Sequence, residues 1–151
     1  MMIIRKATQS DTEFIVENNM CLALETEGRE IDKKLVQKGV KNVFFHKENG
    51  FYIVAEENKD IIGQIFVTIE WSDWRNQSIW WLHRIYVKNE YRHQGVFSAL
   101  LHNVFQLAEC ETVYALRLYM MTDNETAEKI YKHFGFERTP FLILQNKKKC
   151  E

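Results

Sequence analysis

The chain has 151 residues, of which 46% are hydrophobic and 27% charged, and its 20 Lys and Arg and 21 Asp and Glu leave a net charge of −1. This length and composition predict a single domain over residues 1–151 and exclude a disordered chain. The balanced charge argues against nucleic-acid and anionic-membrane partners. No run is apolar and long enough for a signal peptide or a membrane span, and three scattered cysteines make no disulfide framework. We therefore expect a cytoplasmic protein.

The first half of the chain predicts a strand, two helices and three further strands. Residues 2–8 read as the first strand, and Ser10 with Glu13 has the spacing of a capping box for a helix that ends at Gly28. Asp32 is expected to cap the second helix, which carries Leu35, Val36 and Val40. The three further strands are expected at residues 51–56, 61–71 and 78–87.

The second half contains the clearest helical pattern. Its apolar residues recur at helical spacing and are Phe97, Leu100, Leu101, Val104, Phe105 and Ala108. A strand is expected at 113–120, a helix at 124–133 ending at Gly135, and a last strand at 141–144. This order predicts an α/β (α+β) fold, in which a mixed central sheet combines an antiparallel meander with one βα crossover unit and is flanked by helices.

One segment, residues 85–97, joins a strand end to a helix start through a polar turn. The residues of interest are Ile85, Tyr86 and Val87 on the strand, Arg92, His93, Gln94 and Gly95 in the turn, and Val96 and Phe97 on the helix. Backbone amides at a helix N-terminus bind pyrophosphate, Gly95 permits close approach, and Arg92 adds charge. The alternative is an ordinary strand-to-helix joint. No Walker lysine pattern and no GxGxxG occur, so the usual nucleotide-binding motifs have no support.

The segment resembles the coenzyme A motif of the GNAT acetyltransferase superfamily, in which a Val-containing strand runs into Tyr-Arg-x-x-Gly-x-Gly/Ala. Residues 5–11, Gly63 and residues 123–136 are similar to three further parts of that family, in the same order. The resemblance covers nearly the whole chain and implies acetyl-coenzyme A as co-substrate. Phe97 stands where the family has a second small residue, and its helical spacing predicts that it turns into the core.

The resemblance and the chemistry assign Tyr131 as the general acid that protonates the leaving thiolate, because a phenol can give a proton to a thiolate held close to it. The alternative is a tyrosine that packs with Phe134. Asn124 is implied to contact the coenzyme A arm, and it suits a helix cap as well. Relatives carry a carboxylate base on the strand at 78–87, where this chain offers His83 instead. A structural histidine, with Glu70 or a water chain as the base, is the alternative. The histidines have no metal-ligand spacing.

The loop before that strand is similar to one in the diamine acetyltransferase branch. Trp71, Asp73 and Trp74 suit a cationic amine, and Glu25 adds negative charge. Tryptophans that anchor a hairpin, and a solvated glutamate, are the alternatives. We expect an N-acetyltransferase for a small primary amine, in a family whose members are often homodimers. The competing hypotheses are acetylation of a protein lysine or N-terminus, and an acetyl-coenzyme A-binding module without catalysis.

Overall fold

The computed structural model describes residues 1–149, and its contacts divide the chain into two compact units, Met1–Leu118 and Tyr119–Glu151. We describe each unit by itself. In the part of the chain that is described, no helix combines the length and the apolar character that a membrane span requires.

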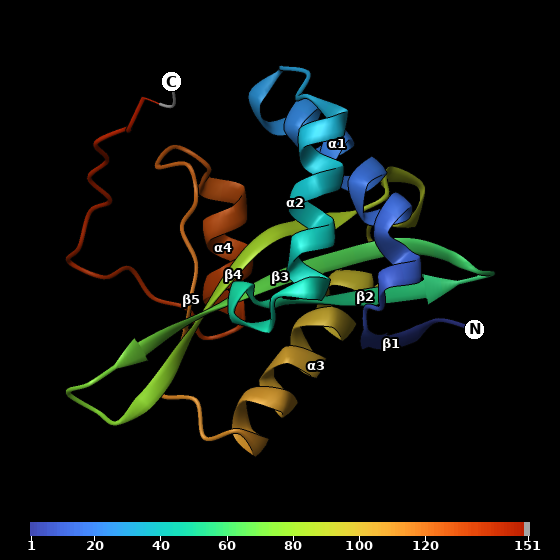
Figure 1. The fold of residues 1–151 in the computed structure, drawn as a ribbon. Helices are drawn as coiled ribbons and strands as arrows, with labels where there is room; N and C mark the ends of the chain where they lie inside the picture. The colour runs from blue at the N-terminus through green and yellow to red at the C-terminus, as the bar shows by residue number, and fades with distance from the viewer. Residues whose placement is uncertain (150–151) are drawn as a thin grey trace. The chain divides into compact units, whose positions relative to one another are not determined.

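The first unit is built on a five-stranded mixed sheet (Figure 1). Its strands, in chain order, are β1 (Ile3–Lys6), β2 (Phe51–Glu57), β3 (Asp60–Ser72), β4 (Gln77–Val87) and β5 (Ala115–Arg117). They lie side by side in the same order; β1 to β4 pair antiparallel, and β5 pairs parallel to β4. The predicted α/β fold class, with a meander and one crossover, is confirmed.

Helices cover both faces of this sheet (Figure 1). α1 (Thr12–Glu27) and α2 (Lys33–Phe45) bury Ile15, Val16, Val40 and Val43 in one cluster with Tyr52, Val54 and Ile61 of the sheet. α3 (Val96–Cys110) lies on the other face. A Cβ on Gly63 would come within 3.0 Å of Val96 Cγ1 and 3.1 Å of Leu100 Cδ1, so Gly63 permits this close approach of helix and sheet.

Three short 3₁₀ turns, Gln9–Asp11, Lys47–Asn49 and Asn89–Tyr91, join these elements. The side chain of Asp32 caps α2 by accepting from the amides of Lys34 and Leu35, as predicted. Gly28 ends α1 with a φ of 63°, in the left-handed region that suits glycine.

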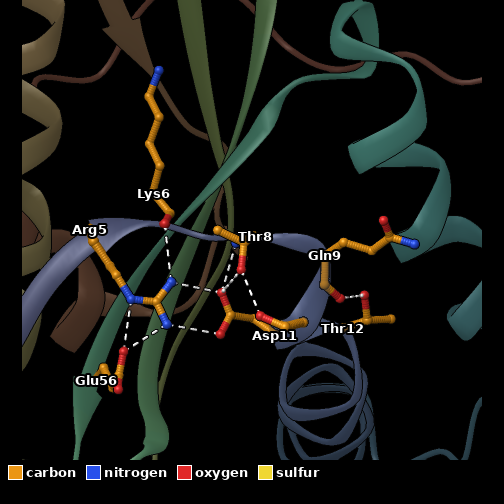
Figure 2. Close-up of polar contacts among 8 residues, drawn as sticks. Arg5, Lys6, Thr8, Gln9, Asp11, Thr12 and Glu56 are labelled. Carbon is orange, nitrogen blue, oxygen red and sulfur yellow. Dashed lines mark hydrogen bonds and ion pairs between the residues drawn. The ribbon is translucent and has the colours of Figure 1, made fainter.

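The entry to α1 is fixed by a polar cluster that differs from the predicted capping box (Figure 2). The Arg5 guanidinium donates to both carboxylate oxygens of Asp11, at 2.7 and 2.9 Å, and to Glu56 of β2 at 2.8 Å. The Thr8 amide also donates to Asp11, at 2.7 Å. Thr8 and Asp11 therefore take the places expected for Ser10 and Glu13, because the chain turns through a 3₁₀ segment before α1 begins at Thr12.

The second unit contains α4 (Glu125–His133). Asn124 caps it by accepting from the Ala127 amide at 3.1 Å, and Gly135 follows it with a φ of 89°. Ile130 on this helix is exposed, although the helical pattern of residues 124–133 favours its burial.

Two strand predictions need correction. The strand expected at 113–120 shortens to β5, whose pairing with β4 runs from Ile79↔Ala115 to Trp81↔Arg117. The strand expected at 141–144 is not formed, and residues 141–149 have no regular structure. A strand exists through its ladder with a neighbour, so an apolar, β-prone run after Pro140 does not suffice by itself.

Candidate active site

A β-bulge in β4 shapes the middle of the sheet. Phe66 pairs with His83, but Gln64, two residues earlier on β3, pairs with Tyr86, so β4 carries one extra residue between these pairs. Arg84 lies in the bulge with a φ of 49°, a left-handed conformation that is uncommon for arginine. The pairing of β5 with β4 ends at Trp81, before the bulge.

The bulge corrects the predicted alternation along this strand. We expected Ile79, Trp81, His83, Ile85 and Val87 to share one face. His83 pairs with Phe66 and Val87 pairs with Gly63, and these two β3 residues lie on opposite faces because they are three positions apart. Val87 therefore lies on the face of α3, whereas Tyr86 joins His83 on the face of α1.

The turn between β4 and α3 has the backbone geometry expected of an anion site. His93 and Gly95 have φ values of 60° and 82°, while Gln94 between them does not have a positive φ. Such alternation turns successive amides toward one side of a loop. The first helical bond of α3 runs from the Ala99 amide to the Gly95 carbonyl at 3.0 Å, so the amides ahead of Ala99 lie at the N-terminal end of the helix. A Cβ built on Gly95 meets no atom within 4 Å, which leaves open space over this end.

The first residues of α3 differ from the prediction. Val96 is buried and starts the core-facing stripe that continues through Leu100, Leu101, Val104 and Ala108. Phe97 is half-buried and is not among the fully buried residues of this stripe. The buried stripe therefore begins at Val96, the first residue of α3, one residue before the start of the apolar pattern in the sequence.

The Arg92 guanidinium makes contacts with other residues of the chain. Its Nε donates to the Val87 carbonyl at 2.8 Å, and a terminal nitrogen donates to the Glu25 carboxylate at 2.6 Å. The guanidinium also lies 5.5 Å from the centre of the Tyr86 ring. Glu25, predicted to lie at the acceptor cleft, therefore contacts the turn in this structure. Burial, followed by Cys21 and Glu25, raises the pKa of Tyr86 to about 12, so its phenol stays protonated.

His83 has the properties of a neutral imidazole. Its Nε2 lies 2.8 Å from Thr68 Oγ1, and its ring contacts Phe66 with centroids 6.0 Å apart. Burial, and then the positive charge of Arg84, lower the pKa of His83 below its ordinary value of 6.5. A histidine that is neutral at physiological pH can accept a proton.

Glu70, the alternative base, is engaged by two neighbours. It accepts from the Trp81 indole at 3.1 Å and lies 3.9 Å from the Arg117 guanidinium.

The tryptophan loop lies at the far end of β4 from the turn. Trp71, one residue before the end of β3, pairs with Ser78, and Trp74 at the hairpin tip is 89% exposed. Asp73 Oδ1 accepts from the Trp74 amide at 3.0 Å. β4 has 11 residues, so about 30 Å of strand separates the hairpin tip from Val87 at roughly 3.3 Å per residue. The structure thus brings His83 and the turn to one half of β4 and places Trp71, Asp73 and Trp74 beyond the other.

In the second unit, Asn124 and Tyr131 stand at the start and near the end of α4. The Tyr131 ring makes an edge contact with Phe136, at 5.9 Å between centroids. Burial raises the pKa of its phenol above the ordinary value of 10, so Tyr131 carries its proton at neutral pH.

Sequence reasoning missed two buried amides, Asn19 and Gln64. Gln64 lies in the middle of an apolar strand and is completely buried. A glutamine within the run Ile61–Val67, otherwise apolar apart from Gly63, was the signal available.

Comparison with known proteins identifies the family. The model of the acetyltransferase (GNAT) family matches residues 16–136. The chain belongs to this family. Two curated proteins are similar over part of their length: thialysine N-epsilon-acetyltransferase of Bos taurus, 33% identical over 75 residues, and an uncharacterized N-acetyltransferase of Methanocaldococcus jannaschii, 28% identical over 91 residues. The matches cover 50% and 60% of this chain, but 44% and 40% of those relatives.

Solved structures show the same fold over almost the whole chain. A possible acetyltransferase from Clostridium difficile 630 is 31% identical, with a TM-score of 0.93 and 99% of both chains covered. A predicted acetyltransferase from Clostridium acetobutylicum, crystallised with acetyl-CoA, has a TM-score of 0.78 over 97% of this chain and 96% of its own. At 21% identity, this second likeness speaks for the fold alone.

Proposed function

We propose that this GNAT-family protein transfers the acetyl group of acetyl-coenzyme A to the primary amine of a small molecule, and that residues 1–151 act as one acetyltransferase domain. The observation that carries the proposal is the turn between β4 and α3. It offers amides at a helix N-terminus, left-handed residues at positions 93 and 95, and open space over Gly95. A pyrophosphate fits such a site. The thioester would supply the activated acetyl group.

In this proposal the strand end and the turn bind the co-substrate. The residues concerned are Ile85, Tyr86, Val87, Arg92, His93, Gln94, Gly95, Val96 and Phe97, with Asn124 on the coenzyme A arm by family resemblance. Because Glu25 and the Val87 carbonyl take up the guanidinium of Arg92, the backbone amides supply most of the attraction for phosphate.

His83 and Tyr131 are proposed to move the protons. The lowered pKa of His83 keeps its imidazole neutral, which suits it to take a proton from the acceptor ammonium before the attack, or from the amine nitrogen as its bond to the acetyl carbon forms. The raised pKa of Tyr131 keeps its phenol protonated and able to supply a proton to the leaving thiolate. The engagement of Glu70 by Trp81 and Arg117 favours His83 over Glu70 as the base.

The acceptor class is inferred from one relative and from the residues of the tryptophan loop. A relative named for acetylating thialysine, a small amine, supports a small-molecule acceptor. Trp71, Asp73 and Trp74 at the hairpin tip are one proposed set of acceptor contacts, through aromatic faces and a carboxylate, and Glu25 beside Arg92 at the turn is a separate one.

Thiol release from acetyl-coenzyme A, measured with a panel of diamines, amino acids and peptides, tests the proposal. Turnover on a small amine is expected. Turnover on peptides alone would assign a protein substrate, and binding of acetyl-coenzyme A without turnover on any amine would contradict the enzymatic function.

A further inference from the structure

A buried polar network connects α1 to the bulge of β4. Gln64 Nε2 donates to Asn19 Oδ1 at 2.8 Å and to the Arg84 carbonyl at 3.3 Å. Asn19 Nδ2 in turn donates to the Tyr52 hydroxyl at 3.2 Å. Gln64, Asn19 and Tyr52 are all buried, so the contacts among these three side chains form out of reach of bulk water, whereas the bond to the Arg84 carbonyl is partly buried.

The Gln64 amide can take one orientation in this network. Both neighbours of its nitrogen are acceptors, the Asn19 carbonyl oxygen and the Arg84 backbone carbonyl. A flipped amide would place its oxygen against both of them. In the observed orientation the nitrogen makes both hydrogen bonds of the Gln64 side chain, and Oε1 has no hydrogen-bond partner within residues 1–149.

The bulge in β4 explains why Gln64 donates to the Arg84 carbonyl. A bulged residue leaves the regular ladder, and its backbone groups then require other partners. Gln64 provides one for the Arg84 carbonyl. The same bulge places the Val87 side chain on the face of α3, and the Val87 carbonyl accepts from Arg92 of the turn. The conformation at Arg84 thus sets how β4 enters the turn.

We propose that Gln64, oriented by Asn19, is a positioning residue that holds the β4 bulge and thereby sets the geometry of His83 and of the turn after β4. The importance of this geometry for catalysis rests on the proposed acetyltransferase function. The role of Gln64 in holding the backbone can be measured without that function.

Asn18, the neighbour of Asn19 on α1, provides a matched control for Gln64. It is also a buried amide, and its Nδ2 donates to the Ile61 carbonyl at 3.2 Å. Ile61 lies opposite Glu56, beside the irregularity between β2 and β3. The Asn18 and Gln64 side chains therefore each donate to a backbone carbonyl near a break in strand register, but only Gln64 contacts the break in β4.

The experiment compares Gln64→Met with Asn18→Leu, each of which replaces a buried side-chain amide with an apolar side chain. Hydrogen–deuterium exchange of the free proteins is the first readout. In Gln64→Met, amides of residues 83–95 should exchange about tenfold faster than in wild type, as loss of a buried hydrogen bond predicts. In Asn18→Leu, the faster exchange should instead fall in β2 and the start of β3. Equal protection of residues 83–95 in wild type and Gln64→Met would overturn the proposal.

Steady-state kinetics of the folded variants give the second readout. Gln64→Met should lower kcat/KM for acetyl-coenzyme A on the order of 10²-fold, since small displacements of a site have effects of this size. Asn18→Leu should remain near wild type. If both variants lose activity equally, general destabilisation explains the loss and the positioning role is wrong.

If Gln64→Met does not fold, Asn19→Ala removes the acceptor that orients Gln64 and should give the same exchange pattern with a smaller change. Unchanged exchange of residues 83–95 in Asn19→Ala would equally contradict the proposal. A wild-type protein without acetyl transfer would contradict the proposed function, while the exchange comparison would still decide the role of Gln64.

Discussion

Replacing Gly95 by tryptophan tests whether the turn after β4 binds the coenzyme A pyrophosphate. Gly95 has a φ of 82°, so any side chain there costs about 1–2 kcal/mol of folding free energy. Apart from its chain neighbours, no atom lies within 4 Å of a Cβ at this position, so the first carbon of the new side chain meets no clash. The indole would occupy the space over the N-terminus of α3 that the pyrophosphate needs.

The size of the effect follows from the amides at that end of the helix. A hydrogen bond to a charged group contributes about 1.5–3 kcal/mol. Loss of two such bonds corresponds to about 3 kcal/mol or more, which weakens binding on the order of 10²-fold. Isothermal titration calorimetry with coenzyme A measures this change directly.

Gly28 offers the matched control for this variant. It also has a positive φ, 63°, and open space around a Cβ, but it caps α1 outside the turn. Gly28→Trp should lose similar stability in urea unfolding and keep its coenzyme A affinity. A folded Gly95→Trp protein that binds coenzyme A as tightly as Gly28→Trp would refute the pyrophosphate assignment.

Four further predictions concern the catalytic groups, the acceptor and stability. Tyr131→Phe should lower kcat by about 10²–10⁴-fold with little change in coenzyme A affinity; wild-type kcat in single-turnover assays would return Tyr131 to a packing role. His83→Gln should abolish the acid limb of the pH–rate profile, which in wild type lies below pH 6.5 because the pKa of His83 is lowered; an unchanged limb would exclude His83 as the base. Trp74→Ala should raise KM for the best amine more than KM for acetyl-coenzyme A, and equal changes would indicate a structural tryptophan. Asp11→Asn should cost about 2 kcal/mol of unfolding free energy at pH 7, measured by urea unfolding.

The Asp11 prediction has a defined pH dependence. Burial alone would raise the pKa of Asp11, but the hydrogen bonds from Arg5 and Thr8 outweigh it and the pKa lies below the usual value. The carboxylate therefore stabilises the fold fully above the unfolded-state pKa of about 4, and this contribution disappears as the pH falls through the folded-state pKa. The difference between wild type and Asp11→Asn should shrink in that acidic range, and a constant difference down to pH 2 would contradict the role of the ion pair.

Local signals predicted the parts of the site that depend on neighbouring residues. Gly95 between a strand and an amphipathic helix marked the turn, and Asn124 marked the start of α4. The β4 bulge could not be predicted in this way. It depends on Gln64 from another strand and Asn19 from a helix, and no local pattern announces a left-handed arginine at position 84.

The remaining errors also come from tertiary context. Alternation beyond His83 failed because it assumed an unbroken ladder, and the buried stripe of α3 was placed one residue late, from Phe97, because helical spacing does not fix where a stripe begins. The run at 141–144 has the composition of a strand, but composition does not provide the neighbour with which a strand must pair.

Through the ion pair between Glu25 and Arg92, the affinities for the two proposed ligands, an acceptor ammonium and the phosphate of coenzyme A, would depend on each other. An acceptor ammonium that took Glu25 would leave the guanidinium beside the turn uncompensated, which strengthens the attraction for a phosphate. By thermodynamic reciprocity, a phosphate that drew Arg92 away would strengthen binding of the ammonium by the same factor. Because partly exposed ion pairs contribute at most about 1 kcal/mol, this linkage is limited to roughly fivefold in either affinity. The ammonium and the phosphate should therefore raise each other's affinity by at most this factor, and the effect should be lost in Glu25→Gln.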